Sequence, residues 1–207
     1  MRGRTIVEHT PPTTPNTILY LLNKPYGMLS QFTREAPHHR TLADLEVEFP
    51  KDVYPVGRLD HDSEGLLLLT NDRALNARLL DPRRKRPKVY WVQIEGDPTA
   101  ADLEPLRRGV DIRVKKRTHR TAPARVRLLA EPPALWERDP PVRFRAQIPT
   151  RWIELELTEG KNRQVRRMCA RVGFPVLRLV RVAVAGYRLD GLAPGVVRVV
   201  ATPHSRR

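Results

Sequence analysis

An acid-bearing loop beside a run of leucines is the strongest candidate for chemistry in this chain. Residues 57–65 read GRLDHDSEG, and four leucines, Leu66–Leu69, follow at once. A short apolar run bounded by turn residues predicts a buried strand, so the loop should lie at the edge of a core. Asp60 follows Arg58 by two residues. A carboxylate with a neighbouring cation at such an edge indicates a reactive centre.

The same loop has a second interpretation, as a metal site. Asp60, Asp62 and Glu64 alternate, so an extended loop would place three carboxylates on one side, where they could hold Mg²⁺ for phosphodiester chemistry. Against this, residues 63–65 have turn chemistry and no second acidic cluster is present in the sequence. We therefore expect no metal and no cofactor, and keep a metal-dependent nuclease as an alternative.

A further candidate, Arg166, lies on a helix predicted over residues 163–172. At 100° per residue, an apolar stripe faces the core and three arginines lie opposite it; the stripe is Val165, Met168, Cys169 and Val172, and the arginines are Arg163, Arg167 and Arg171. Arg166 falls at the flank of the stripe. It could reach a carboxylate at the core edge, or simply extend its stem along that edge.

Two apolar or aromatic side chains are ambiguous from pattern alone. Tyr90 alternates with Val89 and Trp91 on a predicted strand, so it faces one side of that strand, where a tyrosine is commonly a core residue. Leu179 lies in an apolar strand pattern, and a place in the core is the better interpretation of that pattern.

The elements that must position these residues are predicted from periodicity and turn signals. Strands are expected over residues 18–22, 66–69, 89–95, 124–130, 152–157, 176–184 and 196–200. Helices are expected over residues 41–49, 73–80, 99–108 and 163–172. Asn71 or Asp72 should cap the second of these helices, and Thr99 and Asn162 the last two.

Strands interleaved with few helices predict an α+β fold, in which helices flank a mixed, largely antiparallel central sheet. Residues 1–16 are rich in Pro and Thr and predict a disordered tail. Residues 17–202 would form one catalytic domain of two lobes sharing the sheet, with a basic active-site cleft. Within it, residues 138–149 are predicted to be a long loop facing RNA.

Composition favours a nucleic acid as partner. The formal net charge is +15 and the pI is about 10.9, and such an excess favours a polyanion because neutralised phosphates release counterions. No apolar run approaches the roughly 20 residues that span a bilayer. The lone cysteine, Cys169, excludes an internal disulfide and a Cys-clustered zinc site. We expect a cytoplasmic location and no membrane contact.

Three motifs in order resemble those of the RsuA-type pseudouridine synthase family. The first is the GRLD sequence of residues 57–60, and the second is Lys88-Val89-Tyr90. The third is EGKNRQVRRM over residues 159–168, where the family usually has histidine before the glutamine and this chain has Arg163. The resemblance covers about residues 18–200.

The resemblance implies a role for each candidate residue. Asp60 would be the catalytic residue and Arg166 the basic residue that pairs with it. An opposite charge nearby keeps a half-buried carboxylate ionised, as a nucleophile or base requires. Tyr90 would stack beneath the target uracil, Arg58 would help open the RNA and hold the extruded nucleotide, and Leu179 would be an apolar contact.

The resemblance also implies a reaction: cofactor-free isomerisation of one uridine in large-subunit (23S) ribosomal RNA, near the peptidyl-transferase region. The short segment before the first strand indicates no S4 domain. We expect a monomer that does not act on DNA. A catalytically silent rRNA-binding or assembly factor remains the main alternative.

Overall fold

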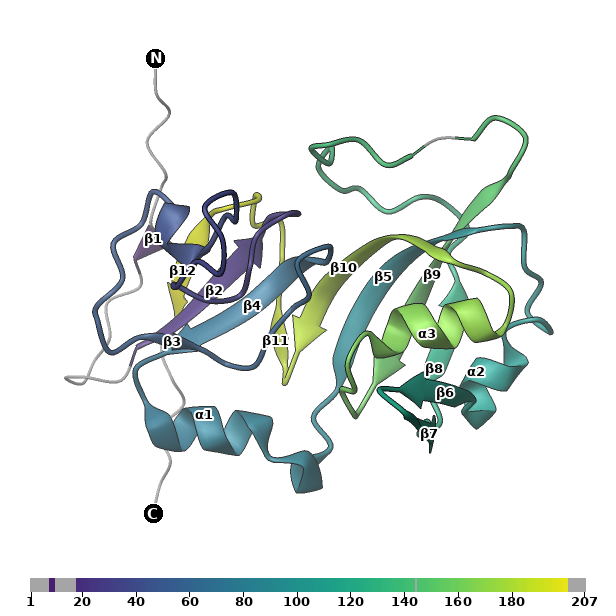
Figure 1. The fold of residues 1–207 in the computed structure, drawn as a ribbon, viewed down its shortest axis with the longest axis horizontal. Helices are drawn as coiled ribbons and strands as arrows, with labels where there is room; N and C mark the ends of the chain where they lie inside the picture. The colour runs from purple at the N-terminus through teal and green to yellow at the C-terminus, as the bar shows by residue number, and fades with distance from the viewer. Residues whose placement is uncertain (1–7, 10–17, 144, 201–207) are drawn as a thin grey trace. The chain divides into compact units, whose positions relative to one another are not determined.

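The computed structural model describes residues 8–9, 18–143 and 145–200. The chain divides into two compact units (Figure 1). Unit 1 comprises residues 1–81 and 189–207, and unit 2 comprises residues 82–188. Unit 1 is therefore built from two separate segments of chain, and all of unit 2 lies between them in the sequence.

The sheet of unit 1 is centred on β2 (Leu19–Lys24), which pairs antiparallel with β12 (Val197–Val200) and β4 (Glu64–Thr70). Short strands extend it at both sides: β3 (Tyr54–Pro55) pairs antiparallel with β4, and β1 (Glu8–His9) pairs parallel with β12. Every residue of β2 and β4 is buried. This confirms the buried strand predicted over the leucines.

The helix predicted after that strand is also confirmed. Helix α1 spans Arg73–Leu80, and Asp72 caps it, because its Oδ1 accepts hydrogen bonds from the backbone N–H groups of Ala74 (2.8 Å) and Leu75 (3.0 Å). The cap satisfies two of the backbone donors that a helix start leaves without partners.

The helix predicted over residues 41–49 is wrong. Only a 3₁₀ turn, η1 (Leu42–Asp44), forms, and Asp44 turns back to accept a hydrogen bond from the Thr41 N–H (2.8 Å). Beyond it the chain is not helical; Leu45, Val47 and Phe49 alternate with exposed residues and pack against the core of unit 1. The segment thus follows a two-residue period and not a helical one.

The sheet of unit 2 is antiparallel throughout its main strands, in the order β10, β5, β9, β8. Their bounds are Val176–Val184, Lys88–Glu95, Thr150–Leu157 and Arg125–Leu128. The two-residue strand β11 (Tyr187–Arg188) pairs with β10, and the 3₁₀ turn η2 (Pro82–Arg84) precedes β5. All four long strands lie within or close to their predicted ranges.

Helix α3 (Gln164–Arg171) lies on one face of this sheet (Figure 1). Val165, Met168 and Cys169 are buried, as the predicted stripe requires, in the core cluster that contains Tyr90. The predicted Asn162 cap is wrong. Arg163 precedes the helix in a left-handed conformation (φ 51°), and Asn162 Oδ1 instead accepts a hydrogen bond from Arg167 (3.0 Å).

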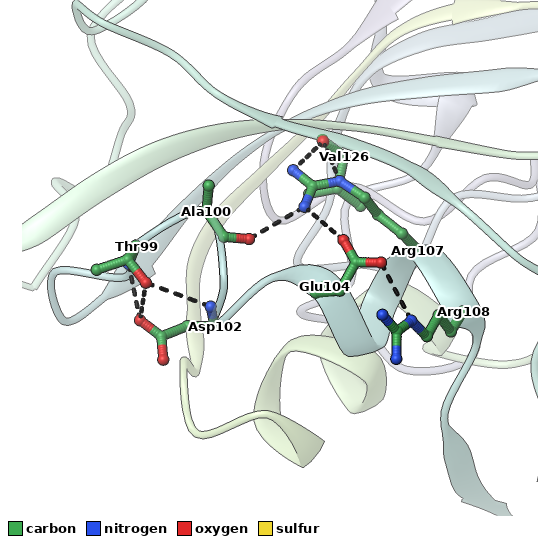
Figure 2. A network of polar contacts seen from close by, with 7 residues as sticks. All are labelled: Thr99, Ala100, Asp102, Glu104, Arg107, Arg108 and Val126. Carbon is green, nitrogen blue, oxygen red and sulfur yellow. Dashed lines mark hydrogen bonds and ion pairs between the residues drawn. The ribbon is translucent and has the colours of Figure 1, made fainter.

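Helix α2 (Glu104–Arg108) starts later than predicted and is tied to β8 by polar contacts (Figure 2). Thr99 does cap a turn, because its Oγ1 accepts a hydrogen bond from the Asp102 N–H (3.3 Å), but that turn precedes the helix. In return, the N–H and hydroxyl of Thr99 donate to Asp102 Oδ2 at 2.8 and 2.7 Å. Arg107 donates from Nε and Nη2 to the Val126 carbonyl (3.0 and 2.8 Å). These bonds fix α2 against the edge strand.

The longest element that was not predicted is a hairpin in unit 2. Strands β6 (Asp111–Val114) and β7 (Arg117–Arg120) form a two-stranded hairpin, between residues 108 and 124, where neither helix nor strand was predicted. The predicted loop over residues 138–149 does lack helix and strand in its described part.

The fold is α+β with a mostly antiparallel mixed sheet, as predicted, in which β1 and β12 pair in parallel. No helix within residues 8–9, 18–143 and 145–200 is long and apolar enough to cross a membrane. Of the tail predicted over residues 1–16, only Glu8 and His9 are described, and the remainder lies outside the described residues.

Candidate active site

The loop that carries Asp60 is anchored through the residue before it. Leu59 is buried, and the Ser30 hydroxyl lies between both of its backbone polar groups. Ser30 Oγ donates to the Leu59 carbonyl (2.9 Å) and accepts from the Leu59 N–H (3.0 Å). One side chain thus satisfies a buried donor and a buried acceptor, and fixes the backbone at the position next to Asp60.

A second anchor follows Asp60 in the chain. The Gly27 N–H donates to the His61 carbonyl (3.0 Å), and the Ser63 N–H closes a turn onto the Asp60 carbonyl (3.0 Å). The turn that contains Gly27 is itself held by the fully buried Lys24, whose Nζ donates to the Pro25 and Met28 carbonyls (2.9 and 2.7 Å). The backbone of Asp60 is therefore positioned from both sides.

The side chains of this loop differ in their exposure. Asp60 and Asp62 are half-buried and Arg58 is exposed, whereas Glu64 is buried within β4. Glu64 thus belongs to the strand and not to an extended loop with the other two acids. In the described parts of the chain, no group of three or more His, Cys, Asp or Glu side chains is placed to hold a metal ion.

In unit 2, one face of the sheet brings together Tyr90 and Leu179. Tyr90 lies on β5 and Leu179 on β10, and both are buried in the core cluster that α3 covers. Arg181 stands directly opposite Tyr90 in the register of these two strands and is only 4% exposed. Opposed residues of an antiparallel pair share a face of the sheet, so the side chain of Arg181 lies on the same face as the ring of Tyr90.

Arg166 lies at the flank of α3, as predicted, and is half-buried. Its Nη1 donates to the Val176 carbonyl (3.4 Å) at the start of β10. Burial raises the pKa of the adjacent Cys169 thiol to about 12, although the Arg166 charge opposes this. The thiol therefore stays protonated at neutral pH, consistent with a core residue and not a nucleophile.

Glu159 fixes the start of α3. Its Oε1 accepts hydrogen bonds from the Ala122 N–H (2.8 Å) and the Gln164 amide (2.5 Å), and its Oε2 lies 3.1 Å from His119 Nε2. Burial disfavours ionisation of Glu159, but these contacts outweigh it, and the pKa of its carboxyl lies below the usual value.

Cations gather near Tyr90 in unit 2. Burial lowers the pKa of Lys88, and the charge of Arg181 lowers it further, while Glu159 opposes the shift. Lys88 is two residues from Tyr90 on β5. The tyrosine face therefore lies in a positive environment, suited to an anionic ligand.

The five predicted site residues divide between the units: Arg58 and Asp60 belong to unit 1, and Tyr90, Arg166 and Leu179 to unit 2. The pairing of Asp60 with Arg166 stays a prediction. Three supporting residues were missed, namely Lys24, Ser30 and Arg181. For Lys24 and Arg181, a cation inside an apolar strand pattern could have indicated a buried functional side chain. No pattern near Ser30 in the sequence indicates its contact with Leu59.

The sequence profile described as "RNA pseudouridylate synthase" matches residues 18–171. The chain belongs to this family, and is thus an RNA pseudouridine synthase, an isomerase. The family assignment drawn from the three motifs is confirmed.

Three relatives are named as pseudouridine synthases of the large ribosomal subunit. The protein of Xanthomonas axonopodis pv. citri (strain 306) called "Ribosomal large subunit pseudouridine synthase E" is 59% identical over 190 residues, which cover 91% of this chain and 97% of that protein. The one of the same name from Vibrio vulnificus (strain CMCP6) is 53% identical over 89% of this chain and 76% of its own. "Ribosomal large subunit pseudouridine synthase B" of Bacillus subtilis (strain 168) is 35% identical over 187 residues, which cover 90% of this chain and 69% of that protein.

Solved structures confirm the fold. One described as "Crystal structure of pseudouridylate synthase" gives a TM-score of 0.72 at 23% identity, covering 91% of this chain and 72% of that one. The structure described as "Human RNA Pseudouridylate Synthase Domain Containing 1" gives a TM-score of 0.58 at 16% identity, covering 90% of this chain and 80% of that one.

Proposed function

We propose that this chain, acting as a monomer, isomerises one uridine of large-subunit (23S) ribosomal RNA to pseudouridine, near the peptidyl-transferase region. The observation that carries the substrate is the 59% identity, along nearly the full length of both chains, to a protein named for the large ribosomal subunit. The net charge of +15 agrees with an rRNA substrate.

The reaction sets what the protein must supply. The uracil is detached from C1′, rotated, and rejoined through C5, so every atom is retained and no cofactor is consumed. The target base must first leave its stack, at a cost of a few kcal/mol, and enter a pocket that stacks and hydrogen-bonds it. Because the detached uracil must not escape, we expect the pocket to close around it, and a closed pocket also excludes water.

We assign Asp60 as the catalytic carboxylate. In support, its backbone is held on both sides by Leu59 and His61, and such positioning lowers the entropy that a reactive group loses on the way to the transition state. Attack on C1′, attack on C6 and removal of a ribose proton are all compatible with a positioned carboxylate.

The remaining assignments follow the motifs. Tyr90 stacks on the flipped uracil, Arg166 pairs with Asp60, Arg58 helps open the RNA, and Leu179 is an apolar contact. In this proposal units 1 and 2 together form one catalytic domain over residues 17–202.

The test of the substrate is to map pseudouridine in 23S rRNA from cells with and without this gene. We expect one site to lose its modification and to regain it on complementation. Unchanged rRNA modification would reject the proposal, and RNA binding without modification would instead support an assembly factor.

The test of the catalytic residue is Asp60→Asn, which keeps size and hydrogen bonding but removes the charge. We expect pseudouridine formation to be abolished, with folding and RNA affinity nearly intact. Activity within about tenfold of wild type, equivalent to only ~1.4 kcal/mol in barrier, would show that Asp60 is not the catalytic residue.

A further inference from the structure

The hairpin of β6 and β7, residues 111–120, carries an unusual density of positive charge, and we refer to it as the basic hairpin. Its basic side chains outnumber its acidic ones by five to one; they are Arg113, Lys115, Lys116, Arg117 and Arg120, against Asp111. All of these side chains are exposed. A charge run of this kind can be merely solvated, so its contacts decide what it indicates.

The pairing register separates the two faces of the basic hairpin. Ile112 is buried in the core cluster of unit 2, and Val114 packs against it. Alternation along β6 places Arg113 on the opposite face, where it stands across from Thr118. The two lysines form the turn, with Lys115 in a left-handed conformation (φ 56°). Arg113 and Arg120 therefore lie on the face away from the core that contains Tyr90, whereas Arg117 stands opposite Val114 beside the turn, where its side chain is exposed.

The base of the basic hairpin is fixed. The Val110 N–H donates to Thr121 Oγ1 (2.9 Å) and the Thr121 N–H to the Val110 carbonyl (3.0 Å). Gly109 allows this close approach, since a Cβ there would lie 2.3 Å from the Thr121 carbonyl oxygen. His119 contacts Glu159 at 3.1 Å. A hairpin held this way loses little entropy when it binds a partner.

The charges of the basic hairpin are not neutralised within the protein. Among the described residues, Arg113, Lys115, Lys116 and Arg117 form no ion pair, and Arg120 reaches Asp111 only at 3.8 Å. Four other exposed arginines of unit 2 are paired: Arg108 with Glu104, Arg125 with Glu156, Arg127 with Glu154 and Arg151 with Asp97. Four neighbouring like charges repel one another, and an external polyanion would relieve that repulsion.

We propose that the basic hairpin is an RNA-docking surface, which binds phosphates of the substrate outside the pocket that receives the target uridine. The inference rests on the proposed function, since that supplies the RNA. Flexible lysines at a turn and exposed arginines suit phosphate oxygens and read no base edges. Their contribution is affinity that falls with salt, because each phosphate contact releases counterions.

The test compares two variants of equal net charge. The hairpin variant combines Arg113→Gln, Lys115→Gln, Lys116→Gln and Arg117→Gln. The control variant combines Arg108→Gln, Arg125→Gln, Arg127→Gln and Arg151→Gln, whose arginines are already ion-paired. Binding of transcribed 23S rRNA and pseudouridine formation at saturating RNA are measured for both, over a series of KCl concentrations.

We expect the hairpin variant to bind more weakly and its log–log salt slope to fall by roughly 0.7 to 0.9 for each lost contact. Its rate at saturating RNA should equal that of wild type. The control variant should change the salt slope by less than the amount expected for the loss of one phosphate contact. If the four-residue variant does not fold, as judged by circular dichroism, the turn variant Lys115→Gln, Lys116→Gln should show about half the effect.

Two outcomes would overturn the inference. Equal loss of affinity in both variants would mean that only net charge matters, and unchanged affinity in the hairpin variant would mean that RNA does not dock there. A failure of the proposed function is separate, because wild-type protein would then form no pseudouridine in 23S rRNA.

Discussion

Asp60 takes its position from its neighbours in the chain. Leu59 is buried and its two backbone polar groups are satisfied by Ser30, while the His61 carbonyl accepts from Gly27. Because these contacts are to the backbone, the side chain at position 60 can be changed without disturbing them. This is why the isosteric amide variant is a fair test of charge.

Arg166 is the residue whose role can be tested most sharply against a neighbour. Replacing it with Met keeps the helix and the apolar stem but removes the cation proposed to pair with Asp60. We expect the rate at saturating RNA to fall severely with little change in RNA affinity. Arg166→Lys should be milder, since it keeps the charge and loses the planar fork.

Arg167→Met is the matched control for that experiment. It lies one position further on α3, and its guanidinium bonds the uncharged side chain of Asn162, which does not cancel its charge. Its loss should therefore change RNA affinity and salt slope but not the saturated rate. Single-turnover kinetics and binding curves measure both quantities. If Arg166→Met behaved in the same way as Arg167→Met, Arg166 would be a phosphate ligand and not the partner of Asp60.

At the scale of elements, Glu159 joins the start of α3 to the chain around Ala122. Glu159→Gln keeps the shape but weakens hydrogen bonds to a charged acceptor, so we expect unfolding to become easier by about 1–3 kcal/mol at neutral pH. The folded pKa of Glu159 is depressed. Its stabilisation is therefore present above the unfolded pKa and is lost as the pH falls through the folded pKa.

Urea unfolding of wild type and Glu159→Gln at neutral and acidic pH measures this. The difference in unfolding free energy should shrink on acidification. The exposed Glu131→Gln serves as control and should differ little from wild type at either pH. A Glu159→Gln difference that is independent of pH would contradict the role assigned to its charge.

Elements with a strong local signal could be predicted from the sequence. The leucines of β4 and the Asp72 cap of α1 each carry their information within a few residues. The helix prediction for residues 41–49 is wrong because two apolar patterns overlap there. Leu42, Leu45 and Phe49 fit a helical spacing, while Leu45, Val47 and Phe49 fit a two-residue spacing. Tertiary packing selects the second.

The basic hairpin and the supports of Asp60 could not be predicted, for different reasons. The hairpin has few apolar residues, and its turn contains two lysines in place of the Asn or Gly that mark such turns. Ser30 acts on a residue far from it in sequence, and no single-sequence pattern encodes such a contact. Motif resemblance predicted the roles of the site residues, and the structure adds their burial and their grouping within each unit.

For the molecule as a whole, we expect pseudouridine formation to survive exhaustive EDTA treatment of the protein. One reason is that Glu64 lies within β4 and does not share an extended loop with Asp60 and Asp62. Another is that the described residues contain no cluster of side chains that could hold a metal ion. Turnover should be measured on prefolded RNA whose structure is checked separately, since Mg²⁺ also stabilises RNA. Activity lost on chelation and restored by Mg²⁺, with the RNA fold unchanged, would favour a metal-dependent reaction.

The division of unit 1 into two chain segments has a consequence for how the protein is made. Strands β2 and β4 leave the ribosome early, but β12, which completes their sheet by pairing with β2, follows the whole of unit 2. Unit 2 is continuous and can fold as soon as it has emerged. The sheet of unit 1 must wait with an unpaired edge on β2, so the unit that carries the Asp60 loop is completed last.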